Sequence, residues 1–192
     1  MKKNLTPNES LKNIETILNE TQSKRTGASF YYVLWGIVLF IYFFLNFIIS
    51  SWPFLHHSNL QSWIWIIFPV GGILSVINKK KDQGIETVVS HYERVYFFAF
   101  SSFAMSYGFA TIASFSLNNH LSLILFPMLL GITVYVVGGI TKHTASIVGG
   151  LLGVLLSVLS IFSGLELQFV FAALAALFSS LIPGILMKNR HV

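Results

Sequence analysis

Apolar stretches separated by short polar segments dominate the chain from residue 30 onward. A helix needs about 20 mostly apolar residues to cross the hydrocarbon core of a bilayer. Six stretches approach or exceed this length: residues 30–50, 60–77, 94–116, 121–140, 145–163 and 167–187. Because the last four are joined by very short connections, each should run antiparallel to the next. The pattern predicts an all-α polytopic membrane protein with six transmembrane helices in an up-down bundle.

The segment before residue 30 follows a different pattern, which predicts a short amphipathic helix. Thr6 is a suitable N-cap, Pro7 suits the first helical position, and Glu9 completes a capping box with Thr6. Apolar residues then recur on one helical face, at Leu11, Ile14, Ile17 and Leu18. We therefore expect three parts: a cytoplasmic helix and linker at 1–29, a transmembrane domain at 30–187 and a cytoplasmic tail at 188–192.

The apolar face of this helix should pack against something, because an isolated helix of this length is only marginally stable in water. The candidates are the membrane surface, the protein's own cytoplasmic loop and a partner, and the mixed charges of the helix favour protein. A second apolar stripe at 79–93 is a natural counterpart. The predicted docking face comprises Leu11, Ile14, Leu18, Ile85, Val88 and Tyr92. The alternative, with each stripe lying separately at the membrane interface, is left open.

Composition and charge support the membrane class and add an orientation. Charged residues make up 10% of the 192 residues, whereas soluble domains carry about 25%. With six spans, all 12 Lys and Arg residues fall on one side together with both termini. Cytoplasmic loops are enriched in Lys and Arg, so we expect both termini to be cytoplasmic. The net charge of +5 then reflects topology and not nucleic-acid binding, and the lipid bilayer is an expected partner.

Small residues in the fifth apolar stretch form a continuous helical face. Its members follow one another at intervals of three or four: Ser146, Gly150, Gly153, Ser157, Ser160 and Gly164. A looser version occurs in the third stretch, at Ser102, Ser106, Ala110 and Ala113. In lipid, such faces let helix backbones approach closely, so we interpret the first as a helix-packing seam. Its partner is either another helix of this chain or a second protomer of a homo-oligomer.

Three prolines lie inside the apolar stretches, at Pro69, Pro127 and Pro183. Proline lacks a backbone N–H and its ring clashes with the preceding turn, so each is expected to kink its helix. Broken helices frame the binding sites of some transporters, although kinks without such a role are commoner. The prolines are therefore one basis for the alternative hypothesis of a carrier or channel, given below.

Catalytic and metal-binding chemistry finds little support in the sequence. Every Asp, Glu, Lys and Arg falls in a loop, a terminus or the end of a span, which argues against proton pumping and buried acid–base catalysis. The chain has no cysteine, so disulfides and cysteine-ligated metals are excluded. Imidazole and carboxylate groups in the outer loops could meet as a metal site, but their spacing lacks a metal-binding motif: His56, His57, His120 and Glu166. We expect no catalytic residue, metal or cofactor.

Short motifs are spread over nearly the whole chain. They are "ESL" in the N-terminal helix, "LWG" at 34–36, "NKKK" at 78–81, "GI" at 131–132, "GGI" at 138–140, "IVGG" at 147–150 and "IPGIL" at 182–186. Together they resemble a group of small bacterial integral membrane proteins. The resemblance implies a six-helix membrane fold and brings no reaction, ligand or cofactor with it.

Two main functional hypotheses result. The leading one is a non-enzymatic accessory or sensory protein, whose cytoplasmic face binds a protein partner or a second copy of the chain. The alternative is a small carrier or channel for an apolar or lipid-like solute, which would use the kinks at Pro69 and Pro127 and the hydroxyl groups of the third apolar stretch. A membrane enzyme that uses the outer histidines ranks third.

Overall fold

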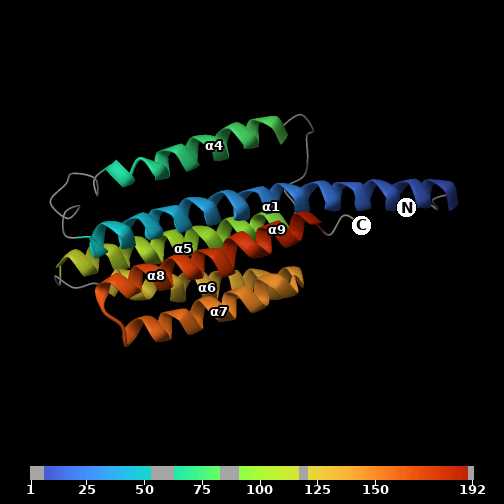
Figure 1. The fold of residues 1–192 in the computed structure, drawn as a ribbon. Coiled ribbons are helices and arrows are strands. Elements are labelled where there is room, and N and C mark those ends of the chain that lie inside the picture. The colour runs from blue at the N-terminus through green and yellow to red at the C-terminus, as the bar shows by residue number, and fades with distance from the viewer. Residues whose placement is uncertain (1–6, 53–62, 83–90, 117–120, 190–192) are drawn as a thin grey trace.

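The computed structural model describes residues 7–52, 63–82, 91–116 and 121–189, and the regular elements in these ranges are all helical. They are α1 (Pro7–Ser51), α4 (Ile67–Asp82), α5 (His91–Ser116), α6 (Leu121–Thr141), α7 (Thr144–Ile161), α8 (Leu165–Ala176), the π-helix η1 (Leu177–Leu181) and α9 (Ile182–Asn189). The helices lie side by side along one direction (Figure 1). The all-α class predicted from the sequence is confirmed for this part of the chain.

Five helical stretches are long and apolar enough to cross a membrane: Ala28–Ser51, Arg94–Ser116, Leu121–Thr141, Thr144–Ile161 and Leu165–Lys188. The apolar part of α4, Ile67–Asn78, is shorter. At 1.5 Å per residue it extends about 18 Å, against a hydrocarbon core of roughly 30 Å. The structure is therefore compatible with a multi-pass membrane protein that has five spans of full length and a shorter apolar helix beside them.

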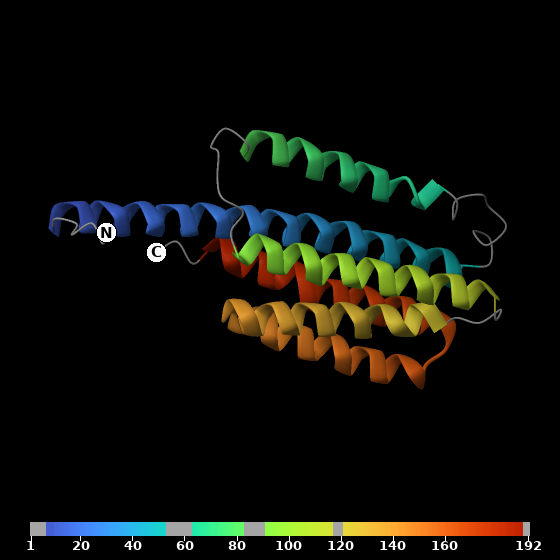
Figure 2. The ribbon, with the colours of Figure 1, turned by 180° about the vertical axis from the view of Figure 1, so that it is seen from behind.

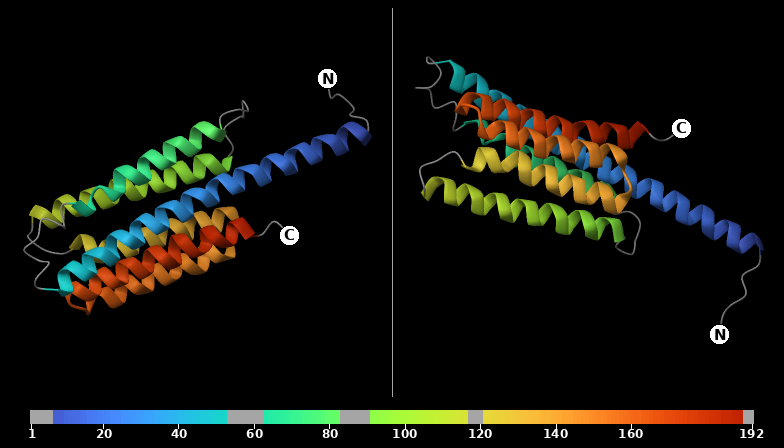
Figure 3. Two further views of the ribbon diagram at one scale, coloured as in Figure 1. Left: turned by 45° about the horizontal axis from the view of Figure 1, so that its top comes forward. Right: turned by 90° about the horizontal axis from the view of Figure 1, so that it is seen from below.

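The N-terminal helix and the first apolar stretch form one uninterrupted helix, α1, of 45 residues. This corrects the expectation of a separate helix and a linker at 1–29. The cause lies in the sequence: no proline occurs between Pro7 and Ser51, and a single glycine at the junction, Gly27, costs about 1 kcal/mol without ending a helix. Figures 1 and 3 show that the first turns of α1 extend past the other helices. We call residues 7–27 the arm.

The second apolar stretch was expected at 60–77, but α4 begins only at Ile67. A turn precedes it, in which the Ile66 N–H donates to the Trp63 carbonyl (3.1 Å). Pro69 consequently occupies the first turn of α4, where a missing backbone N–H leaves no helical hydrogen bond unmade. Trp63 and Ile64 before the turn are helical, so the helical path is interrupted at residues 65–66, just ahead of Pro69, and the kink expected at this proline stays a prediction.

The core lies between α1, α6 and α8. Phe43 of α1 and Phe126 of α6 are each 1% exposed, with ring centroids 4.4 Å apart. Leu130 and Val134 continue the buried row along α6, and Ala172 is one of the small residues of α8 in the same cluster. Side chains thus fill the space between these three helices. Across the bundle, α8, α7, α6 and α5 follow one another (Figure 3).

One end of the bundle carries the basic residues. The ends of α4, α6 and α9 and the starts of α5 and α7 lie at the end from which the arm projects (Figure 2). Arg94 in the first turn of α5, Lys142 after α6 and Lys188 in the last turn of α9 belong to this end. We call it the basic end.

Candidate functional site

The predicted packing seam of α7 faces the same chain. Ser146, Gly150, Gly153, Ser157 and Ser160 are buried. A Cβ on Gly150 would lie 2.5 Å from the Tyr135 nitrogen and 2.6 Å from the Gly131 carbonyl oxygen. These separations leave no room for a methyl group, so the backbones of α6 and α7 are in direct contact. The Ser157 hydroxyl also donates to the Ile124 carbonyl of α6 (2.8 Å). The partners left open by the sequence are thus helices of the same chain: α6 at Gly150 and Ser157, and both α6 and η1 at Gly153.

Gly164, the last predicted member of the seam, does not belong to it. It is exposed at the N-cap of α8, and a Cβ there would meet nothing within 4 Å. The reason is that α7 ends at Ile161. Beyond that residue, a spacing of four no longer corresponds to one face of a helix.

A cluster of hydroxyl groups joins α1 and α7 to the C-terminal helix, which comprises η1 and α9, near the basic end. Ser29 of α1 donates to the Gly184 carbonyl (2.7 Å), and Ser180 of η1 donates to the Tyr32 carbonyl (2.8 Å). Ser179 donates to the Gly149 carbonyl of α7 (2.9 Å). All three serines are buried. We call these three hydrogen bonds and their residues the junction.

Pro183 explains why the junction contains a π-helix. Proline has no N–H to donate, and its ring conflicts with the carbonyl four residues earlier, here that of Ser179. The chain widens by one π turn instead, in which the Ile182 N–H donates to the Leu177 carbonyl. From this turn the Ser179 hydroxyl forms a hydrogen bond to α7, and the Ser180 hydroxyl forms one to α1. Pro127, by contrast, lies buried inside α6, which continues from Leu121 to Thr141.

The turn between α6 and α7 is closed by His143. Its side chain is 2% exposed, and its Nδ1 caps α7 by accepting from the Ser146 backbone N–H (3.2 Å). Lys142 precedes it with φ 54°, a left-handed conformation that suits the end of a helix. The buried His143 ring thus satisfies one of the first backbone N–H groups of α7, which have no partner within the helix.

Several predicted site residues are not brought together in the described parts of the chain. Ile85 and Val88 of the docking face lie outside the described residues, as do His56, His57 and His120. Leu11, Ile14 and Leu18 belong to the arm, and Tyr92 is the second residue of α5. Glu166 is exposed in the first turn of α8. Among the described residues, no group of three or more His, Asp or Glu side chains gathers where a metal ion could bind.

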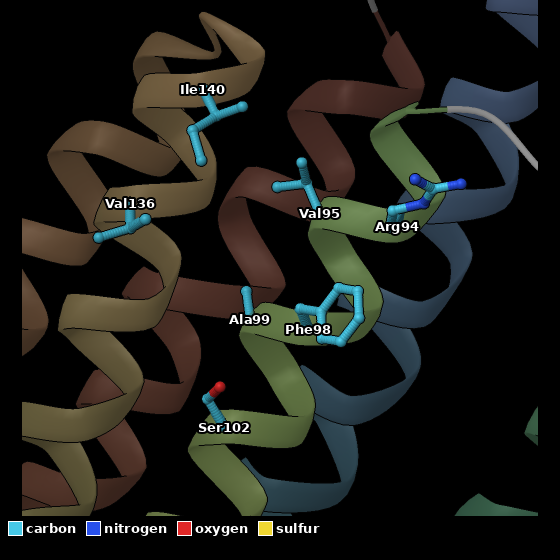
Figure 4. Close-up of a pocket in the computed structure, with 7 residues that line it drawn as sticks. All are labelled: Arg94, Val95, Phe98, Ala99, Ser102, Val136 and Ile140. Atoms are coloured by element: carbon cyan, nitrogen blue, oxygen red, sulfur yellow. The ribbon is translucent and has the colours of Figure 1, made fainter.

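A shallow groove between α5 and α6 opens on the outside of the bundle near the basic end. It has a volume of about 380 Å³ and is lined by Arg94, Val95, Phe98, Ala99, Ser102, Val136 and Ile140. Figure 4 shows Val95, Ala99 and Ser102 on the side of α5 that faces Val136 and Ile140 of α6. Arg94 also belongs to the lining, near the start of α5, and it is the one charged group there; its side chain extends toward the side of α5 away from α6 (Figure 4). Sequence reasoning missed this groove because its two walls are about 40 residues apart in the chain.

Two sets of aromatic contacts fix α5 against different neighbours along its length. Aromatic contacts hold α5 in place further along: the Tyr107 ring lies 5.3 Å from Phe126, and the Phe103 ring 5.9 Å from it. Near the basic end, Tyr96 and Phe100 instead pack edge-on against Tyr32 of α1 (5.8 and 5.6 Å). The small side chains of Ala99 and Ser102 then leave the α6 side unfilled.

In the part of the chain that the structure describes, the arrangement offers a surface groove and a helix junction. Comparisons with protein-family models, with curated proteins and with solved structures find no match to this chain.

Proposed function

We propose that this chain is a non-enzymatic accessory or sensory protein of a bacterial inner membrane. In this proposal six helices cross or enter the bilayer in an up-down order, with α4 as the short second member, and both termini lie in the cytoplasm. The arm of α1 binds a protein partner or a second copy of the chain.

The distribution of basic residues supports this orientation. Arg94, Lys142 and Lys188 belong to the end from which the arm projects, and the arm itself contains Lys12 and Lys24. No Lys or Arg occurs in the sequence between Ser51 and Ile77, between Val95 and Thr141, or between His143 and Met187. Since Lys and Arg are concentrated on the cytoplasmic side of membrane proteins, the basic end is the cytoplasmic end.

The continuity of α1 is the observation that carries the proposal. A single helix links the arm, which extends about 30 Å at 1.5 Å per residue, to the buried face around Tyr32 and Phe43. Where the arm meets the bundle, Ser29 is hydrogen-bonded to the Gly184 carbonyl. A partner that tilts or rotates the arm would therefore displace α1 against α9, which is the kind of helix shift that transmits signals between packed helices.

Paired substitutions on the arm test the proposal. The variant Ile14→Asp/Leu18→Asp places two charges on the apolar face. The matched control, Thr16→Asp/Asn19→Asp, adds the same charge on the opposite face of the helix. Oligomeric mass in mild detergent and cross-linking in native membranes are the measurements. We expect the first variant to lose the assembly and the control to keep it; equal assembly in both variants would count against the proposal.

The orientation has its own test, because the chain has no native cysteine. Single variants Lys142→Cys and Glu166→Cys place thiols at exposed positions at opposite ends of the bundle. With a membrane-impermeant maleimide applied to intact cells or spheroplasts, we expect labelling of Glu166→Cys and protection of Lys142→Cys until the membrane is opened. The reverse pattern would invert the proposed topology.

The carrier alternative has weaker support. The space between α1, α6 and α8 is filled by buried side chains such as Phe43, Phe126 and Leu130. The groove beside Arg94 opens outward from the bundle instead of leading through it (Figure 4).

A further inference from the structure

The groove between α5 and α6 faces the surroundings of the bundle. In the most apolar part of α5 only 6% of residues are buried, the lowest share among the five long apolar helices. Phe98 is 61% exposed, and Val136 and Ile140 on the opposite wall are about half exposed. In a bilayer these side chains face lipid, so the molecules with direct access to the groove are the acyl chains of the surrounding membrane.

The length of the groove matches one leaflet. Arg94 and Ser102 mark its two ends along α5, and a rise of 1.5 Å per residue separates them by about 12 Å. Half of the hydrocarbon core measures about 15 Å. Between these ends the lining is apolar apart from the Ser102 hydroxyl. An acyl chain lying along α5 would thus have apolar contacts over most of the thickness of one leaflet. Arg94, the only cation of the lining, would lie at the membrane surface.

We propose that this groove binds an anionic phospholipid, with one acyl chain between α5 and α6 and the phosphate at the Arg94 guanidinium. A guanidinium presents several N–H donors in a plane and can bind two phosphate oxygens at once. Arg is therefore a more specific phosphate ligand than Lys. Lys142, exposed two residues beyond Ile140, adds positive charge at the same end. Basic pockets between membrane helices on the cytoplasmic side bind anionic headgroups in this way.

Charge and shape favour a lipid over a second copy of the chain. A helix with its side chains is about 10–12 Å across, whereas a groove of about 380 Å³ along about 12 Å of α5 is only wide enough for a narrower group such as an acyl chain. A phospholipid brings its own negative charge to the depth at which Arg94 lies.

The test uses full-length protein, stripped of lipid in detergent and titrated with phosphatidylglycerol or phosphatidylcholine while bound lipid is counted by native mass spectrometry. We expect phosphatidylglycerol to bind more tightly, and Arg94→Gln to weaken its binding about tenfold while leaving phosphatidylcholine unchanged. Arg94→Lys, which keeps the charge, should retain part of the preference. The matched control is Lys188→Gln, which removes an exposed charge from the same end outside the groove.

A second variant tests the acyl-chain half of the site. Ala99→Phe should fill the groove and weaken the binding of both lipids, and it remains informative if Arg94→Gln does not fold. Equal affinities for the two lipids, or equal losses in Arg94→Gln and Lys188→Gln, would overturn the headgroup assignment. If Ala99→Phe changes the dimer population and leaves lipid binding intact, a second copy occupies the groove and the proposal is wrong.

Discussion

The pair α6–α7 and the helices α4 and α5 are packed by two different means. Between α6 and α7, glycine and serine bring the backbones into contact, and a methyl group on Gly150 would already collide with Gly131. On the other side of the molecule, aromatic rings hold α4 and α5 at a greater distance. The Tyr42 ring of α1 lies 4.8 Å from Phe68, and Tyr32 lies 5.8 Å from Tyr96.

The difference follows from the solvent that each region meets. Lipid solvates apolar side chains, so helices in a bilayer gain little from hiding them and associate through close packing and hydrogen bonds. The pair α6–α7 uses both, through Gly150 and through the bond from Ser157 to the Ile124 carbonyl. Helices α4 and α5 leave most of their large side chains exposed, for example Ile73 at 60% and Phe109 at 72%. We infer that the pair α6–α7 determines the stability of the bundle. Helices α4 and α5 can move or bind lipid with little change in the free energy of unfolding.

The largest effect is expected where backbones touch. Gly150→Ala should destabilise the protein by about 1–3 kcal/mol, because the new methyl group overpacks the contact with Gly131. The matched control is Gly139→Ala on α6, where a Cβ meets nothing within 4 Å. This control should be neutral or more stable by up to about 1 kcal/mol, since alanine is the better helix former. Unfolding by a denaturing detergent at fixed lipid content measures the stability of both variants. Equal effects of the two substitutions would show that the backbone contact between α6 and α7 does not determine stability.

A smaller effect is expected at the junction. Ser29→Ala and Ser180→Ala each remove one hydrogen bond between α1 and the C-terminal helix, at a cost of about 0.5–1.5 kcal/mol. Ser101→Ala is the control, since its hydroxyl donates only to the Phe98 carbonyl of its own helix and is exposed to the surroundings. In the double variant, distance measurements between spin labels on the arm and on α9 should also broaden. An unchanged distance distribution would argue against a junction that couples the two helices.

The sequence predicted those elements whose limits are marked locally. The expected spans at 94–116 and 121–140 agree with the apolar stretches Arg94–Ser116 and Leu121–Thr141, since charged or polar residues interrupt an apolar pattern at each end. The seam on α7 could be found because its members repeat along a single helix. Gly164 was included wrongly, since a periodic spacing does not reveal that the helix has already ended.

The features that the sequence missed depend on residues far apart in the chain. The hydrogen bond from Ser29 to Gly184 joins residues separated by 155 positions. A Cβ on Gly36 would lie 2.7 Å from the Leu181 nitrogen, which no local pattern indicates. The continuity of α1 is a different case. The sequence changes from polar to apolar near position 28, but a change of environment does not require a change of secondary structure.

The smallest effect on global stability is expected at α4. Phe68→Ala removes the ring that packs on Tyr42 and Trp65. Two other links between α4 and α1 remain: the close approach of Gly71 to Val38, and the hydrogen bond from the Tyr31 hydroxyl to the Ser75 carbonyl (3.4 Å). Because the helix has few other buried contacts, its release should be local and shift the unfolding transition by less than about 0.5 kcal/mol.

Spin labels introduced on α1 and α4 measure this release directly. With Phe68→Ala, the distance distribution between Ile41→Cys and Ile73→Cys, both exposed positions, should widen at an unchanged unfolding midpoint. Phe109→Ala on α5 is the control, because its ring is 72% exposed and its loss should leave this distance unchanged. A loss of global stability as large as that of Gly150→Ala would show that the aromatic contacts of α4 belong to the cooperative core. In that case the contrast between glycine-packed and aromatic-held helices would not describe how this bundle is stabilised.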